Sequence, residues 1–135
     1  MPNENKSGYK ILIIDDDAFL LDMYALKFNQ KGFDVSTASG TLQALDKLKE
    51  GLTPEIIVVD LVMPTMDGFE FLEKMKADGL GKDALVIILS NLGQQEDIDR
   101  GLALGASGYI IKASATPSEV VEKVEEVLSK RKAKK

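Results

Sequence analysis

The sequence feature that most constrains the fold is a short apolar run that ends on a carboxylate. The run from Ile56 to Val59 holds four consecutive β-preferring residues, and Asp60 follows it directly. An uninterrupted run of this kind is typical of a strand buried on both faces of a parallel sheet. In an open α/β sheet, ligands bind beyond the carboxyl ends of the strands. Asp60 is therefore expected where chemistry occurs and not in the core.

Other apolar segments also end in polar residues. Residues 9–14 lead into Asp15, Asp16 and Asp17, residues 84–89 lead into Ser90, and residues 107–111 lead into Lys112. Residues 33–38 alternate apolar with polar side chains, as an edge strand with one wet face does. The carboxyl ends of parallel strands share one edge, so these polar groups converge if the sheet order brings their strands together.

Helices are predicted between and after these strands. Their apolar residues recur at helical spacing, as follows: Leu20, Leu21, Tyr24 and Phe28; Leu42, Leu45 and Leu48; Phe69, Leu72 and Met75; Ile98 and Leu102, on the inner face of a helix from about Gln94 to Leu104; and Val120, Val121, Val124, Val127 and Leu128. Five strands alternating with five helices predict right-handed crossovers and a parallel sheet covered on both faces, an α/β fold.

Helix starts carry recognisable signals. Asp67 is placed to cap the helix that follows it, Asp17 is either a helix cap or a solvated acid, and Thr116 with Glu119 forms a capping box around Pro117. Gly101 lies inside the fourth helix, where glycine costs about 1 kcal/mol relative to alanine. That helix is expected to be the most easily shifted.

Composition limits the chemistry. The 135 residues are 44% hydrophobic and 29% charged, which is typical of one soluble domain. No apolar run approaches the roughly 18 residues of a membrane span, and the polar segment from Met1 to Lys10 is not a secretory signal. The absence of cysteine and histidine excludes thiol chemistry and the commonest general base, and it fits a cytoplasmic protein.

Charge is unevenly distributed. The net charge is −5, yet residues 130–135 carry five basic side chains and no acid, which leaves 12 basic and 22 acidic side chains elsewhere. Direct nucleic-acid binding by the acidic body is not expected. The basic end suits the carboxyl end of a helix dipole, although it could also touch an acidic partner.

Four motifs together resemble the receiver domain of response regulators in two-component signalling. They are Ile-Ile-Asp-Asp-Asp, Val-Val-Asp-Leu-Val-Met-Pro-Thr-Met-Asp-Gly, Ile-Leu-Ser and Gly-Tyr-Ile-Ile-Lys. The resemblance implies a doubly wound, flavodoxin-like (βα)5 sandwich of three layers with sheet order 2-1-3-4-5. We expect a stand-alone receiver over residues 9–130, a disordered segment over 1–8 and a basic tail over 131–135.

The resemblance assigns the acidic residues. Asp60 matches the phosphoacceptor, and Asp15 and Asp16 match the pair that holds Mg²⁺ (or Mn²⁺) together with Asp60 and the carbonyl of Val62. Three carboxylates this close repel one another by several kcal/mol, and a hard cation with oxygen ligands resolves that repulsion. The implied reaction is in-line phosphoryl transfer onto Asp60.

The resemblance also assigns residues that respond to the phosphoryl group. Lys112 and Ser90 match its side-chain contacts, the backbone of Val62 and Asn91 matches its amide contacts, and Ser90 with Tyr109 matches the switch pair. Two charge-assisted hydrogen bonds of about 1.5 to 3 kcal/mol each can supply the roughly 5.5 kcal/mol that reverses a 1:99 equilibrium. The fourth helix, fifth strand and fifth helix are the expected output face.

Several positions depart from the family pattern. Ala113 stands where a proline in a cis peptide is usual, so either the loop is strained or Lys112 is presented differently. Asn91 replaces a small residue, where it could crowd the pocket or add a donor. Val62 and Leu92 replace polar groups that orient water, which predicts slow loss of the phosphoryl group.

Partners and alternatives follow from this interpretation. A histidine kinase or histidine phosphotransfer protein would be the donor, and an unidentified downstream protein would receive the signal from a monomer or weak dimer, with no membrane involved. One alternative is a degenerate receiver that binds its partner without phosphorylation, favoured only by Ala113 and Asn91. Another is a Mg²⁺-dependent phosphohydrolase, which would want an acid at position 62, where valine stands.

Overall fold

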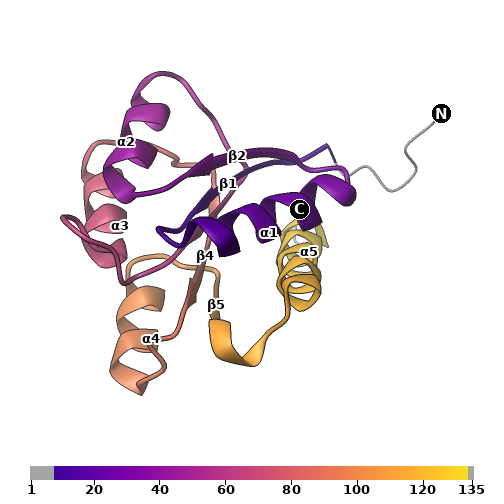
Figure 1. The fold of residues 1–135 in the computed structure, drawn as a ribbon. Coiled ribbons are helices and arrows are strands. Elements are labelled where there is room, and N and C mark those ends of the chain that lie inside the picture. Colours follow the sequence, from indigo (N-terminus) through magenta and orange to yellow (C-terminus); the bar gives the residue numbers. More distant parts are fainter. Residues whose placement is uncertain (1–7, 134–135) are drawn as a thin grey trace.

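A computed structural model describes residues 8–133; the segment expected to be disordered therefore lies outside the described residues except for Gly8, as do the last two residues of the basic tail. The elements alternate as the sequence predicts (Figure 1). In chain order they are β1 (Lys10–Ile14), α1 (Ala18–Gln30), β2 (Asp34–Ala38), α2 (Thr41–Lys49), β3 (Ile56–Val59), α3 (Gly68–Ala77), β4 (Leu85–Ser90), α4 (Gln95–Ala103), β5 (Gly108–Ile111), the 3-10 helix η1 (Lys112–Ser114) and α5 (Pro117–Ala133).

The five strands form one parallel sheet in the order β2-β1-β3-β4-β5, which confirms the predicted order. Near the carboxyl ends, Val59 of β3 pairs with Ile14 of β1 and with Ile88 of β4. Ser90 pairs with Ile111 at the end of β5. Because the strands run the same way and end within a few residues of one another, the polar residues that follow them meet at one edge.

Alternation along the buried strands builds two cores, one on each face of the sheet. In β1, Leu12 and Ile14 pack with α2 and α3, whereas Ile11 and Ile13 pack with α1 and α5. Figure 1 shows the same division, with α2, α3 and α4 on one side of the sheet and α1 and α5 on the other. This is the predicted three-layer sandwich.

None of the helices in residues 8–133 is long and apolar enough to cross a membrane.

The predicted helix caps are confirmed. The Asp17 carboxylate accepts a hydrogen bond from the backbone N–H of Leu20. Asp67 and Glu70 form a capping box at α3, with bonds of 2.8 and 3.0 Å. The Thr116 hydroxyl and the Glu119 carboxylate cap each other's backbone N–H groups at α5. Local sequence therefore fixes where these helices begin.

One prediction for α4 is wrong. Leu102, expected on the inner face, is 48% exposed, and Gly101 is the buried residue of this helix. A Cβ on Gly101 would collide with Cδ1 of Ile88 and touch the ring of Tyr109. The glycine lets α4 lie closer to the sheet than a larger residue allows, and this rotates Leu102 toward water.

Candidate functional site

Three carboxylates meet at the carboxyl edge of the sheet. Asp15 and Asp16 follow β1, Asp60 follows β3, and one oxygen from each lies within 4.8 Å of the others. Asp15 and Asp60 are buried, with 1% and 6% exposed, whereas Asp16 is exposed. The pairing of β1 with β3 brings together residues that are 45 positions apart in the chain, as the sequence predicts.

Lys112 bridges the two buried carboxylates. Its Nζ lies 2.8 Å from Oδ2 of Asp15 and 2.7 Å from Oδ2 of Asp60. Lys112 opens η1 directly after β5, so its side chain crosses beyond the end of β4 to reach the cluster. One ammonium therefore serves two buried anions, and the buried group keeps a net negative charge with the exposed Asp16 beside it.

Burial and ion pairing act in opposite directions on these groups. Burial raises the pKa of the Asp15 carboxyl above its ordinary value, although the hydrogen bond from Lys112 opposes this shift. For Lys112 burial lowers the pKa, but its hydrogen bonds to Asp15 and Asp60 outweigh burial, and the pKa is raised. Both directions fit a pocket with too many carboxylates for its single ammonium. The Lys112 ammonium holds its proton, and Asp15 gives up its own less readily than an exposed carboxyl does.

Backbone N–H groups hold the two buried carboxylates in place. The N–H of Asp17 donates to Oδ1 of Asp15 at 2.9 Å, and the N–H of Val62 donates to Oδ1 of Asp60 at 3.3 Å. The Val62 side chain is 59% exposed and stands at the mouth of the site. The expected roles of the Val62 carbonyl and amide toward a metal and a phosphoryl group stay predictions.

The β4–α4 loop lies beside the cluster. Ser90 is fully buried at the end of β4, and its Oγ accepts a hydrogen bond from the N–H of Leu92 at 3.3 Å. The hydroxyl of Tyr109 on β5 donates to the carbonyl of Leu92 at 2.5 Å. Burial raises the pKa of Tyr109, so its hydroxyl stays protonated and able to donate. The two residues expected to form the switch thus both hold Leu92.

Two of the positions that depart from the family pattern, Asn91 and Ala113, contact each other. Every peptide bond among the described residues is trans, including the one between Lys112 and Ala113, and Lys112 still reaches both carboxylates. The Asn91 side chain accepts a hydrogen bond from the N–H of Ala113 at 2.9 Å. Sequence reasoning considered Asn91 as an obstacle or a donor and missed it as an acceptor. The signal was available, because a residue other than proline at 113 has an N–H that needs a partner.

The donor set fits a hard divalent cation. It consists of carboxylate oxygens, the chain has no histidine or cysteine, and the buried oxygens carry more negative charge than Lys112 neutralises. Mg²⁺ prefers such oxygen ligands and keeps several waters, which the exposed Asp16 side of the cluster can accommodate. The residues present are therefore suited to Mg²⁺ or Mn²⁺.

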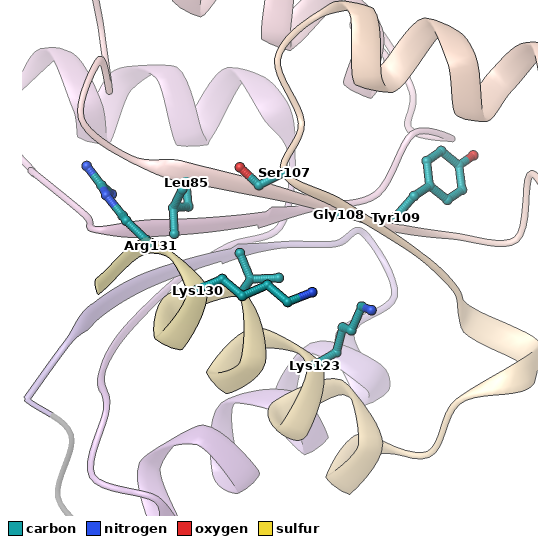
Figure 2. Close-up of a pocket in the computed structure, with 8 residues that line it drawn as sticks. Leu85, Ser107, Gly108, Tyr109, Lys123, Lys130 and Arg131 are labelled. Atoms are coloured by element: carbon teal, nitrogen blue, oxygen red, sulfur yellow. The ribbon is translucent and has the colours of Figure 1, made fainter. Parts of the chain in front are cut away.

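A separate groove runs between the free edge of β5 and the carboxyl-terminal half of α5 (Figure 2). It does not include the three carboxylates. Gly108, which has no side chain, leaves room opposite α5, and three cations border the space. The lining residues are Leu85, Ser107, Gly108, Tyr109, Lys123, Val127, Lys130 and Arg131.

Comparison with known proteins gives a consistent answer. The family model for the response regulator receiver domain matches residues 11–125. The chemotaxis protein CheY of Treponema pallidum is 32% identical, over 92% of this chain and 85% of that protein. The phosphate regulon transcriptional regulatory protein PhoB of Escherichia coli is 31% identical over 88% of this chain, which spans about half of that protein's length.

Solved structures agree with this result. The chemotaxis protein CheY4 of Vibrio cholerae superimposes with a TM-score of 0.81 at 26% identity, covering 90% of this chain and 99% of that one. A CheY-like receiver domain protein of Methanospirillum hungatei gives a TM-score of 0.83 at 28% identity, covering 96% and 100%. The fold and the order of its elements are thus shared over nearly the whole chain.

Proposed function

Because this chain belongs to the response regulator receiver domain family, we propose that it is a phosphorylation-dependent signalling switch in which Asp60 accepts a phosphoryl group from a histidine kinase or a histidine phosphotransfer protein. The observation that carries the proposal is the shared ammonium of Lys112, which holds Asp15 and Asp60 together at the carboxyl edge of the sheet. Structure alone rarely favours two buried carboxylates beside a third acid.

Asp60 is the nucleophile in the proposed transfer. One of its carboxylate oxygens forms a bond to phosphorus while the bond from phosphorus to the donor's imidazole nitrogen breaks, and the electron pair of that bond stays on the imidazole. The N–H of Val62 donates to Asp60 Oδ1, and the Lys112 ammonium donates to Asp60 Oδ2. Lys112 then turns from Oδ2 to an oxygen of the arriving phosphoryl group.

The metal part of the proposal concerns Asp15, Asp16 and Asp60, whose oxygens would hold a Mg²⁺ or Mn²⁺ ion with the Val62 carbonyl. When bound, the ion neutralises charge that builds on the phosphoryl oxygens. The Asp15 carboxylate would exchange the ammonium of Lys112 for the ion, which frees that ammonium for the phosphoryl group. Lys112 would thus pair with the Asp15 carboxylate before the ion binds and contact the phosphoryl group afterwards.

The signal would leave the site through the β4–α4 loop. A phosphoryl oxygen offers the buried Ser90 hydroxyl an acceptor, and a hydrogen bond there would draw Ser90 toward Asp60. Leu92 is held to Ser90 through its N–H and to Tyr109 through its carbonyl, so it would follow. Movement of Leu92 would then reach α4 through the loop and β5 through Tyr109.

We place the output face on α4, β5 and α5. Its support is the free edge of β5 with the neighbouring groove, which Lys123, Lys130 and Arg131 border (Figure 2). Tyr109 borders this groove from β5, while its ring points away from α5 (Figure 2) and its hydroxyl bonds the β4–α4 loop, so movement of that loop would reach β5. A downstream protein would bind there.

The test is phosphoryl uptake from a small donor. Purified protein is incubated with phosphoramidate and Mg²⁺, and intact mass spectrometry should show the gain of one phosphoryl group. Asp60→Asn should gain none. Asp67→Asn is the matched control, because asparagine also caps α3 and the residue stands outside the cluster.

The alternatives give different results in the same assay. A receiver that works without phosphorylation would gain no mass and show no spectral change with beryllofluoride and Mg²⁺. A phosphohydrolase would turn over phosphate esters without retaining the group. Either outcome would overturn the proposal.

A further inference from the structure

The amino end of η1 is capped by a residue of the β4–α4 loop. The first N–H groups of a short helix have no partner within it. Ile111, at the cap position of η1, supplies no side-chain hydrogen bond within the described part of the chain. Asn91 does so instead, since its Oδ1 accepts the N–H of Ala113 at 2.9 Å across 22 residues of sequence.

This bond joins two residues that are each adjacent to a member of the site. Asn91 follows Ser90, and Ala113 follows Lys112. Ser90 and Ile111 are register partners in β4 and β5, so the bond lies just beyond the last rung of the sheet. It fastens the start of the β4–α4 loop to the turn from which the Lys112 side chain extends.

The backbone of Lys112 lies just beyond the last residue of β5. It leaves β5 at Ile111 and enters a turn closed by a 3.3 Å hydrogen bond from the N–H of Ala115 to the Lys112 carbonyl. Its ammonium, however, must reach both Asp15 and Asp60 at the end of a long and flexible side chain. A shift of the η1 backbone would spoil both contacts at once.

We propose that Asn91 is a positioning residue for Lys112: by capping the N–H of Ala113 it holds η1 so that the Lys112 ammonium meets Asp60, and it makes η1 follow the β4–α4 loop when that loop moves. The inference rests on the proposed function, because it deepens the role of Lys112 in phosphoryl transfer. Proline at 113 would lack the N–H, so Asn91 and Ala113 act as a matched pair in this chain.

The first test asks whether the bond exists and acts on Lys112. Three variants separate the effect of the Asn91 acceptor oxygen from that of side-chain volume. Asn91→Ala removes both, Asn91→Leu keeps the volume without an acceptor, and Asn91→Asp keeps an acceptor oxygen. NMR should show that the Ala113 amide loses its hydrogen-exchange protection in the first two variants and keeps it in the third. The Lys112 side-chain resonances should shift together with that loss.

The second test measures action through Lys112. Asn91→Ala should slow phosphoryl uptake from phosphoramidate about three- to tenfold, the factor expected for one neutral hydrogen bond. Asn91→Leu should match it. In a Lys112→Met background the further change to Asn91→Ala should have no effect on the rate, because the residue that Asn91 positions is gone. If Asn91 only stabilised the fold, Asn91→Ala would lower the melting temperature equally in both backgrounds. Its effect on the rate of phosphoryl uptake would then not depend on Lys112.

The outcomes separate this inference from the function beneath it. If the wild type gains no phosphoryl group, the proposed function fails, whereas the NMR variants still report whether Asn91 holds Lys112. If the wild type is phosphorylated but Asn91→Leu behaves as the wild type, or if the effects of Asn91→Ala and Lys112→Met are additive, Asn91 does not position Lys112.

Discussion

Lys112 shows at the level of one residue how the site balances its charge. Its ammonium lies between Asp15 and Asp60, where it relieves their repulsion and also occupies the oxygens that a dication would use. The same contacts that stabilise the site without a metal therefore compete with metal binding. Three predictions concern single residues of this site.

The first prediction concerns metal affinity. Lys112→Met should bind Mg²⁺ more tightly, by about three- to tenfold, because no ammonium has to be displaced and one positive charge is gone. Isothermal titration calorimetry measures this directly. Lys123→Met, which removes a lysine of the β5 groove, should leave the affinity near that of the wild type. Weaker binding by Lys112→Met would show that the lysine does not compete with the ion.

The second prediction concerns pH. Because burial raises the pKa of Asp15, the folded state holds this proton more tightly than the unfolded state. The stability from this group is complete below the ordinary pKa of an aspartic acid and is lost as the pH rises through the raised value. Asp15→Asn has no carboxyl to ionise at this position, so it does not lose this stability as the pH rises, and Lys112 stays paired with Asp60. Without divalent ions it should be more stable than the wild type at neutral pH.

Urea unfolding at a series of pH values tests the sign. The advantage of Asp15→Asn should shrink as the pH falls toward the ordinary aspartate range and the wild-type carboxyl takes up its proton. An advantage that does not change with pH, or a variant that is less stable at neutral pH, would contradict the prediction.

The third prediction concerns the lifetime of the aspartyl phosphate. Val62 at the mouth of the site and Leu92 in the β4–α4 loop have apolar side chains that cannot orient an attacking water. The phosphorylated protein should therefore persist far beyond seconds in Mg²⁺, as followed by mass spectrometry after removal of the donor. Val62→Gln, which adds a hydrogen-bonding group, should shorten the lifetime severalfold. A wild-type lifetime of seconds would refute the prediction.

At the level of elements, α4 is distinguished by how closely it approaches the sheet. Gly101 faces Ile88 and Tyr109. The neighbouring Arg100 stacks on Phe69, with its Cζ 4.1 Å from the ring centroid, and its Nη2 lies 3.8 Å from Oε2 of Glu73. The helix is thus anchored to α3 by one residue and lies against β4 and β5 at the next. A change in the β4–α4 loop therefore acts on a helix that packs closely against the sheet only because Gly101 has no side chain.

Gly101→Ala should destabilise the fold by about 1 to 2 kcal/mol, because the collision with the buried Ile88 outweighs the gain in helix propensity of up to about 1 kcal/mol. Ile88→Val removes the Cδ1 atom that collides. In that background Gly101→Ala should be neutral or stabilising, so a double-mutant cycle in urea should give a coupling of at least about 1 kcal/mol. Additive effects would mean that α4 moves away freely.

For the whole molecule, the sheet order decides what the site can do. Placing β3 between β1 and β4 brings the two acidic strand ends together and sets the buried Ser90 beside them. Binding of a dication to this edge should therefore stabilise the entire domain, because the ion binds an arrangement that the unfolded chain lacks.

Mg²⁺ at about a hundred times its dissociation constant should add about 2.7 kcal/mol of stability, which raises the melting temperature by roughly 10 °C. Asp16→Asn should lose most of this rise. Asp17→Asn is its neighbour and matched control, since asparagine also caps α1 and Asp17 lies outside the cluster. Calorimetry with and without a chelator measures the melting temperature of each variant. An equal rise with Mg²⁺ in both variants would show that the ion binds elsewhere.

Local sequence was enough to predict the elements and the residues at their ends. Apolar periodicity placed the five strands and the five α-helices, although not η1. Asp67 marked the start of α3, the capping box of Thr116 and Glu119 marked that of α5, and the carboxylates after β1 and β3 were visible as residues that end apolar runs. These signals are local, because periodicity and capping depend on residues a few positions apart. The sheet order and the role of each site residue came from the resemblance to receivers.

The contacts between segments could be found only in the folded chain. The bridge from Lys112 to two carboxylates, the bond from Tyr109 to Leu92, the cap that Asn91 gives Ala113 and the inward face of Gly101 all join residues from different elements. Each depends on the distance between backbones and on which rotamer the neighbours leave open. Periodicity gives the face of a helix only approximately, so it could not show that a glycine would take the place expected for Leu102.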